Sequence, residues 1–221
     1  MVRSDSPEPG GVCLPDGGDP GPLRQARFPL VCLDEATKQM VKEIAPPLPV
    51  EKAKPERIDY EYERNGVGTL FMMCAPLEGW RTVDVRSQKR AVDYADCLRM
   101  LCDEAFPEAE KIILVQDNLN THKAASLYEA FDPTEAHRIK QRFEFHYTPK
   151  HASWLNIAEC EFSALARQCL NRRIADMETL QGEVAAWTES RNQSKVKIDW
   201  RFTTADARIK LRKLYPSFHG G

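Results

Sequence analysis

Three acidic side chains in this chain of 221 residues lie where carboxylates could support metal-assisted chemistry. Asp34 follows the apolar run VCL, and Asp117 follows the run ILVQ. In an open α/β sheet, ligands gather at the carboxyl ends of the strands, so these two acids are well placed to meet there. Glu159 lies near the start of a helical pattern that follows the last predicted strand, and from there it can reach back to the same point.

Grouped carboxylates of this kind need a cation, because they repel each other and raise each other's pKa unless a positive charge neutralises them. Carboxylate oxygens together with water suit Mg²⁺ or Mn²⁺. Two such ions, about 3.5–4 Å apart, can clamp the attacking and leaving oxygens of a phosphodiester. We therefore expect phosphodiester chemistry with two Mg²⁺ ions, for which Mn²⁺ could substitute.

Each acid also has an ordinary structural explanation. Asp34 and Asp117 could be turn residues, since Asp and Asn are favoured where strands end and Asp117–Asn118 is a typical turn opener. Glu159 could complete a capping box, because Asn156-x-x-Glu159 matches that pattern at the start of a helical run. The local patterns alone leave both explanations open for each acid.

Longer strings around the acids are more specific. VCLDEATKQ, ILVQDNLNTHKA and FHYTPKHASWLNIAECEFSALARQCLNRRI, in this order, closely resemble the DDE transposases of the bacterial insertion-sequence 630 family, in the mariner superfamily. The closing string WRFTTADARIKLRKLYP also resembles that family, so the resemblance runs from about Phe28 to Pro216. It implies that Asp34, Asp117 and Glu159 are the catalytic and metal-binding acids.

The resemblance also implies a fold, a reaction and partners. The fold is α/β and ribonuclease-H-like, with a mixed five-stranded sheet flanked by helices. The reaction is cut-and-paste transposition, in which the enzyme cuts transposon ends and joins them to a TA dinucleotide by two-metal chemistry. The partners are double-stranded DNA, which carries the terminal inverted repeats and the TA target, and a second copy of the chain in an active homodimer.

The chain departs from the family pattern at two places. It reads LNIAE at 155–159 where much of the family has LNPIE, and Ala158 beside the acid is compatible with the same role. Asp117 and Glu159 are separated by 41 residues, a longer spacer than is usual in the superfamily. The string DPTEAHRIKQR, read as a charged loop or a helix extension, accounts for the added length.

Polar neighbours of the acids are weaker candidates. Glu35 adjoins Asp34, but successive strand side chains point to opposite faces, so only one of the two is expected in the site. Asn118 and His122 could orient a metal-bound water or a phosphate as a second shell around the metal. They could equally be turn and helix-cap residues.

Basic residues near the third acid are candidates for DNA contacts. Lys150 and His151 could touch the DNA backbone, or they could lie in a solvated loop. The net charge of −2 argues against a nucleic-acid protein, but residues 163–221 carry eleven Lys and Arg against six Asp and Glu. Three arginines near the helix of Glu159 could bind phosphate or form an exposed helix face: Arg167, Arg172 and Arg173.

The elements that must position these residues follow from apolar periodicity. Strands are predicted at 29–35, 68–76, 80–88, 111–118 and 143–149, and the second and third should form an antiparallel pair. Helices are predicted at 89–105, 123–131, 156–170, 177–192 and 204–213, and the Pro-broken stretch 44–57 is predicted as a loop. This order of strands and helices indicates a mixed sheet covered by helices.

Composition sets the domain organisation. Residues 1–28, rich in Pro, Gly and Asp, are predicted to be a disordered tail, followed by a catalytic domain at 29–216 and a short tail at 217–221. No apolar run is long enough to span a bilayer and no signal-peptide core is present, so a cytoplasmic, nucleoid-associated protein is expected. Seven cysteines without CxxC spacing predict buried free thiols.

Members of the resembled family carry helix-turn-helix segments before the catalytic domain, whereas only the Pro/Gly tail precedes Phe28 here. We infer a truncated or frameshifted reading frame, or the second half of a split gene. The chain alone is then expected to bind inverted repeats poorly in a gel shift. The alternative is an inactive or regulatory transposase fragment, and a host nuclease of the same fold is disfavoured because the resemblance extends through the C-terminal helices.

Overall fold

The computed structural model describes residues 26–44, 62–118, 123–148 and 156–198. Its strands are β1 (Leu30–Glu43), β2 (Tyr62–Ala75), β3 (Trp80–Arg86), β4 (Ile112–Gln116) and β5 (Phe143–Tyr147). They form one sheet in the order β3-β2-β1-β4-β5. β1 pairs antiparallel with β2 and parallel with β4, so the sheet is mixed, as the sequence predicts.

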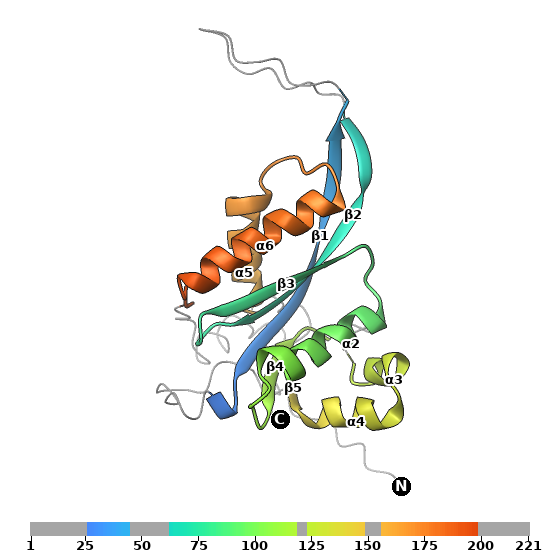
Figure 1. The fold of residues 1–221 in the computed structure, drawn as a ribbon, viewed down its shortest axis with the longest axis vertical. Coiled ribbons are helices and arrows are strands. Elements are labelled where there is room, and N and C mark those ends of the chain that lie inside the picture. Colours follow the sequence, from blue (N-terminus) through green and yellow to red (C-terminus); the bar gives the residue numbers. More distant parts are fainter. Residues whose placement is uncertain (1–25, 45–61, 119–122, 149–155, 199–221) are drawn as a thin grey trace, which may run out of the picture.

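Two layers of helices cover the sheet (Figure 1). The helices are α2 (Ala91–Met100), α3 (Ser126–Ala130), α4 (Pro133–Gln141), α5 (Ala158–Leu165) and α6 (Met177–Gln193). The π-helical turns η1 (Leu101–Ala105) and η3 (Ala166–Leu170) continue α2 and α5. Predicted helices at 89–105, 156–170 and 177–192 are therefore confirmed. None of the helices described is long and apolar enough to cross a membrane.

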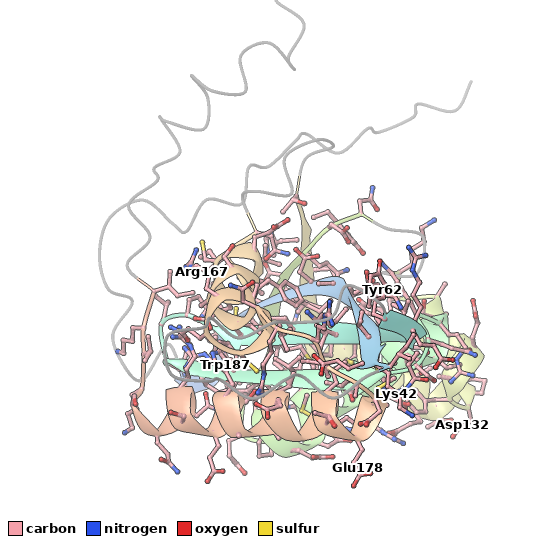
Figure 2. The ribbon with its side chains drawn as sticks, turned by 90° about the horizontal axis from the view of Figure 1, so that it is seen from above. Lys42, Tyr62, Asp132, Arg167, Glu178 and Trp187 are labelled. Carbon is pink, nitrogen blue, oxygen red and sulfur yellow. The ribbon has the colours of Figure 1, made fainter. Side chains whose placement is uncertain are left out.

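Side-chain alternation along the strands builds a separate core on each face of the sheet. Val31 and Leu33 of β1 pack with α2, α3 and α4, whereas Leu30 and Cys32 pack with α5 and α6. Figure 2 shows α6 along one side of the sheet, with Trp187 toward the sheet and Glu178 away from it. The position of each β1 side chain in this alternation therefore decides which helices it meets.

β1 and β2 are longer than predicted. The apolar run ends at Asp34 and Glu35, but the strand continues to Glu43 because its polar half pairs with β2. The loop before α6 also bonds to the polar half of β1, since the Val41 N–H donates to the Ile174 carbonyl at 2.7 Å. The prediction that the first strand ends at the acids is wrong, because backbone pairing of a polar, half-exposed strand leaves no apolar pattern.

One helix forms in a segment for which the sequence allows either a charged loop or a helix extension. The string DPTEAHRIKQR forms α4, and its N-terminus is capped by Asp132. The Asp132 carboxylate accepts the N–H groups of Thr134 at 3.0 Å and Glu135 at 3.1 Å. Some predicted elements lie outside the described residues. They are the helix at 204–213, the loop at 44–57 except its first residue, the tail at 217–221, and the tail at 1–28 except its last three residues.

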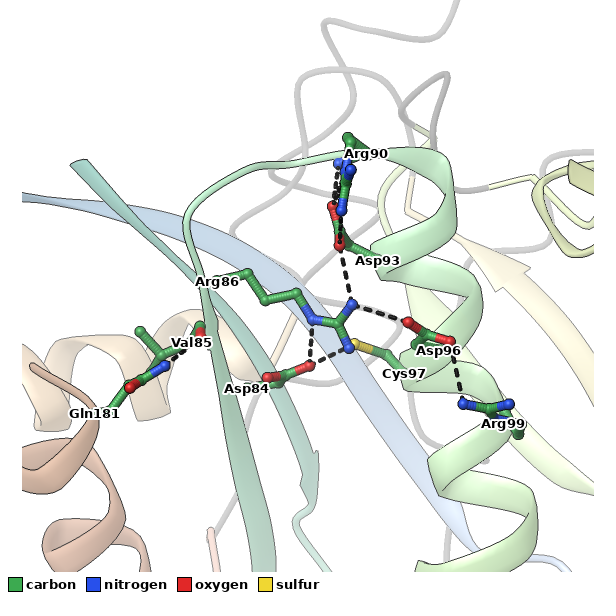
Figure 3. A network of polar contacts seen from close by, with 9 residues as sticks. All are labelled: Asp84, Val85, Arg86, Arg90, Asp93, Asp96, Cys97, Arg99 and Gln181. Atoms are coloured by element: carbon green, nitrogen blue, oxygen red, sulfur yellow. Dashed lines mark hydrogen bonds and ion pairs between the residues drawn. The ribbon is translucent and has the colours of Figure 1, made fainter. Parts of the chain in front are cut away.

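α2 is joined to the edge of the sheet by a network of charges (Figure 3). The Arg86 guanidinium at the end of β3 contacts Asp84 at 2.7 Å, Asp93 at 2.9 Å and Asp96 at 3.0 Å. Asp93 also accepts the backbone N–H and the Nε–H of Arg90. These bonds fix the first turn of α2 against β3.

Cysteine burial is predicted correctly for four thiols and wrongly for one. α5 turns Ala158, Glu161 and Leu165 toward the sheet, which leaves Cys160 exposed. Burial raises the pKa of the Cys102 thiol to about 12. The thiols that are buried as expected are those of Cys32, Cys74, Cys97 and Cys102.

Candidate active site

Asp34 lies inside β1, at the level where the neighbouring strand β4 ends. The parallel register pairs Leu30 with Ile113 and Cys32 with Val115. Asp117 directly follows Gln116, the last residue of β4, so it stands in the chain where this register, if continued, would oppose Asp34. The explanation of Asp34 as a turn residue is therefore wrong, because it is a strand residue with a paired backbone.

Asp34 faces the side of the sheet that carries α5. It lies two residues after Cys32 on β1 and so shares a face with Cys32, which belongs to the core under α5 and α6. Asp34 is 8% exposed, and its carboxylate accepts the N–H of Glu35 at 2.8 Å. Asp117 is half-buried. Asp34 is thus held within the sheet, whereas Asp117 follows a strand end and is more accessible.

Glu35 points to the opposite face of the sheet. Its side chain is 2% exposed and forms an ion pair with Lys89, just before α2. On that face the Tyr94 hydroxyl donates to the buried Gln116 side chain at 2.8 Å, and burial raises the pKa of Tyr94 well above its usual range. The two adjacent acids, Asp34 and Glu35, therefore point to opposite faces of the sheet, as expected for successive strand residues.

Helix α5 is joined directly to β1 at its N-terminus. Asn156 is fully buried, and its Nδ2 donates to the carbonyl of Leu33 at 2.7 Å. Its Oδ1 accepts the N–H of Ala158 at 3.2 Å. Because Leu33 immediately precedes Asp34, this bond holds the first turn of α5, which contains Glu159, next to the first acid.

Glu159 is exposed, and its side chain makes no hydrogen bond or ion pair with the described parts of the chain. The capping-box explanation is wrong, because the Glu159 N–H donates to the backbone carbonyl of Asn156 at 3.1 Å and not to its side chain. The Asn156 amide is used instead to join the helix to β1. Glu159 is therefore a surface carboxylate in the first turn of α5.

Asp34 lies within β1, Asp117 directly follows β4, and Glu159 lies in the first turn of α5. Within the described ranges, no three His, Cys, Asp or Glu side chains lie close enough to hold a metal ion. The chemistry of the donors nevertheless fits, since carboxylate oxygens are what Mg²⁺ and Mn²⁺ prefer. Asp34 is nearly buried, whereas Asp117 and Glu159 are accessible to a cation.

The weaker candidates divide into those the structure describes and those it does not. Asn118 is exposed directly after Asp117. His122, Lys150 and His151 lie outside the described residues.

The three arginines differ in their partners. Arg172 forms an ion pair with Glu183, and Arg173 lies 3.7 Å from Glu43. Arg167 is exposed on η3 and has no ion pair within the described part of the chain. It borders a hollow of about 570 Å³ between η3 and α6, which is also lined by Asn171, Arg172, Trp187 and Ser190.

One charged cluster near the site was missed by sequence reasoning. Glu161 is 1% exposed and meets two arginines, Arg81 of β3 and Arg191 of α6. Burial lowers the pKa of Arg81, and the nearby Glu161 carboxylate opposes that shift. A signal was present, because Glu161 lies four residues from both Ile157 and Leu165, a position that should be apolar on the inner face of the helix.

Comparisons with known proteins agree with this fold. The chain matches the family model for the DDE superfamily endonuclease over residues 29–181, more than half of its length. The structure "Crystal structure of the Mos1 mariner paired end complex with Mn" is similar with a TM-score of 0.52 and 15% identity, over 83% of this chain and 53% of that chain. The structure "Crystal structure of the Mos1 Strand Transfer Complex" matches with a TM-score of 0.49 and 14% identity, over 73% and 47%.

This chain thus spans about half the length of the solved structures that it matches. No curated protein sequence matches it. The family match covers β1 to β5, α5 and the start of α6, and so includes all three acids. The chain therefore belongs to the family of DDE superfamily endonucleases, and its mixed five-stranded sheet flanked by helices has the ribonuclease-H-like fold.

Proposed function

We propose that this chain is the catalytic part of a DDE transposase, which cuts DNA at the ends of a mobile element and joins those ends to target DNA. The observation that supports the proposal is the parallel pairing of β1 with β4, since Asp34 lies on β1 on the face covered by α5 and Asp117 directly follows β4. The bond from Asn156 to Leu33 adds the first turn of α5 to the same place. Family membership supports phosphodiester cleavage as the chemistry.

Asp34, Asp117 and Glu159 are proposed to hold two Mg²⁺ ions, or Mn²⁺ in their place. Asp34 is the fixed ligand, because its strand is paired on both sides and its carboxylate accepts the Glu35 N–H. Asp117 follows a strand end and Glu159 lies on an exposed helical turn, so their side chains turn toward Asp34 when cations bind. Bound metal ions supply an activated water and stabilise the oxygen that leaves.

The acids also impose an order on binding. Three carboxylates at one end of the sheet repel a phosphodiester until cations neutralise them, so metal must bind before or together with DNA. The Glu35–Lys89 pair and the Tyr94–Gln116 bond occupy the opposite face, which leaves the α5 face for the substrate. We therefore propose that the scissile phosphate approaches from the side of α5.

Double-stranded DNA with terminal inverted repeats and a TA target is the proposed substrate, bound by a homodimer. Arg167 is the best described candidate for a backbone contact, since it is exposed and has no ion pair among the described residues. It follows Glu159 by eight residues along α5 and η3, which is about 12 Å along the helix axis. A strand cut at the acids would pass Arg167 within a few nucleotides.

The direct test replaces each acid by its amide and measures Mg²⁺-dependent cleavage and strand transfer on a duplex carrying the element's ends. Loss of an outer partner of a metal ligand already lowers activity by about 10–100-fold. Asp117→Asn and Glu159→Gln remove proposed ligands, so each should lower the cleavage rate by more than about a hundredfold.

Glu35→Gln is the matched control, because this carboxylate adjoins Asp34 in sequence but faces the other side of the sheet. It should retain cleavage, provided that circular dichroism shows a native fold. Full activity of Asp117→Asn or Glu159→Gln would refute the assignment. An inactive wild-type chain that still inhibits an intact transposase would favour a regulatory fragment.

A further inference from the structure

A carboxylate that the proposed chemistry does not use lies two residues after the third acid. Residues two apart on a helix point about 200° apart, so Glu159 and Glu161 lie on opposite sides of α5. Glu159 is exposed, whereas Glu161 is 1% exposed. Fully buried glutamates are rare unless they are paired, so Glu161 requires an explanation of its own.

Glu161 joins three elements of the fold. Its Oε1 lies 2.9 Å from Nη2 of Arg191 on α6, and its Oε2 accepts Nε–H of the same arginine at 3.2 Å. Oε2 also lies 3.3 Å from Nε of Arg81 on β3. These three residues, Arg81, Glu161 and Arg191, are called the α5 clamp below.

Arg81 is itself held on several sides. The Asn192 side chain pairs with its backbone, accepting the Arg81 N–H at 2.9 Å and donating to the Arg81 carbonyl at 2.7 Å. The Arg81 Nη2 donates to the carbonyl of Val196. Its buried Nε and Nη1 find no hydrogen-bond acceptor in the described regions, so Glu161 is the charge that compensates them.

Stability alone is a weak reason for such a cluster. Desolvation of a buried ion pair offsets most of its attraction, and apolar residues of similar volume often serve equally well. What a buried pair does provide is a defined geometry. Here the clamp acts about one turn beyond Asn156, which already joins the start of α5 to Leu33. The Asn156 bond fixes the position of the first turn of α5, and the clamp fixes the rotation of α5 about its own axis.

We propose that the α5 clamp is a positioning device for the third acid: by fixing the rotation of α5, it directs Glu159 toward Asp34 and Asp117. This inference rests on the proposed function, because it assigns a role relative to the proposed metal site. Glu161 itself touches neither metal nor DNA in this account. It acts only through the helix that it shares with Glu159.

The test measures Mn²⁺ binding by the full chain from the EPR signal of free Mn²⁺, without DNA or turnover. Glu161→Gln should raise the apparent dissociation constant about tenfold, the lower end of the cost of losing a supporting partner of a metal ligand. In cleavage assays, the Mg²⁺ concentration for half-maximal rate should rise by about the same factor. A change that only reduced the folded fraction would lower the amplitude and leave that midpoint unchanged.

A double variant separates positioning from charge. Arg81→Met with Glu161→Gln removes one positive and one negative charge, so the net charge near the acids equals that of the wild type. It also avoids leaving Arg81 buried and unpaired, which keeps the test valid if Glu161→Gln alone does not fold. Positioning predicts that the double variant still binds Mn²⁺ about tenfold more weakly.

Leu127→Ala is the control for lost stability, because Leu127 is fully buried on α3 in the core on the other face. It should lower the unfolding temperature and leave Mn²⁺ binding unchanged. Wild-type affinity in both Glu161→Gln and the double variant, or in the double variant alone, would overturn the positioning role. A wild-type chain that binds no Mn²⁺ would instead count against the proposed function.

Discussion

Asp93, at the start of α2, keeps its negative charge although its side chain is only 3% exposed. Burial alone would raise its pKa, but hydrogen bonds from Arg90 and Arg86 outweigh burial and lower the pKa to about 2. An unfolded Asp titrates near pH 4. The folded state therefore gains stability from this charge above about pH 4 and loses it as the pH falls toward 2.

Asp93→Asn tests this link between charge and folding. Each pKa unit corresponds to about 1.4 kcal/mol, so the variant should lose on the order of 2 kcal/mol of unfolding free energy at pH 7. The difference from the wild type should shrink between pH 4 and pH 2, as followed by urea unfolding at each pH. Asp96→Asn is the control, because its more exposed carboxylate shares the same Arg86 and should matter less. A difference for Asp93→Asn that stays constant with pH would contradict the account.

Single residues also show what the sequence can predict about the site. Asp34 and Asp117 both follow apolar runs, and the apolar run correctly predicts the end of β4 near Asp117 but not the continuation of β1 beyond Asp34. The role of Asn156 could not, because its side chain bonds to a carbonyl in a strand 123 residues away. Glu161 carries a local signal, a charge in an apolar stripe, but its two arginine partners come from distant elements.

The β2–β3 turn meets the end of α6, and the contact depends on a glycine. Gly79 has φ +69°, and a Cβ on it would lie 2.7 Å from the carbonyl oxygen of Lys195. Both the left-handed backbone and the close backbone neighbour exclude a side chain there. This contact lies beside the bond from Ile198 to Pro76 and helps seat α6 on the sheet.

Gly79→Ala and Gly182→Ala form a matched pair. Gly79→Ala should lower the unfolding free energy by about 1–3 kcal/mol, the cost of a strained backbone conformation. Gly182 lies in the middle of α6 with nothing near its missing Cβ, so Gly182→Ala should raise it by about 0.5–1 kcal/mol. Chemical denaturation measures both. Equal effects of the two substitutions would show that the turn contact does not matter.

At the scale of elements, the apolar and helical periodicities locate the five strands and four of the predicted helices in the described residues, but not their full lengths. The polar half of β1 is absent from the prediction because backbone ladders with β2 leave no trace in side-chain polarity. The sequence does not decide between a loop and a helix for α4, because only Ala136 and Ile139 of this charged string are buried, too short an apolar pattern to identify a helix. Short-range patterns thus reveal elements with a buried face and miss those held by backbone bonds.

At the scale of the whole molecule, β1 is the strand on which the proposed site depends most. β1 carries Asp34, pairs in parallel with β4, which Asp117 directly follows, and accepts the Asn156 bond that anchors α5. Because it is also the central strand of the sheet, it joins the core on each face. The proposed site therefore depends on the assembled sheet, and no isolated segment of the chain could form it.

Convergence of the three acids on shared cations is the central claim, and iron-directed cleavage tests it most directly. Fe²⁺ takes the place of Mg²⁺, and ascorbate with hydrogen peroxide then generates radicals that cut the backbone near the bound ion. The account predicts cuts near residues 34, 117 and 159 together, suppressed by excess Mg²⁺ and lost in Asp117→Asn. Cuts at only one of these segments, or cuts that Mg²⁺ does not suppress, would show that the carboxylates do not share a metal site.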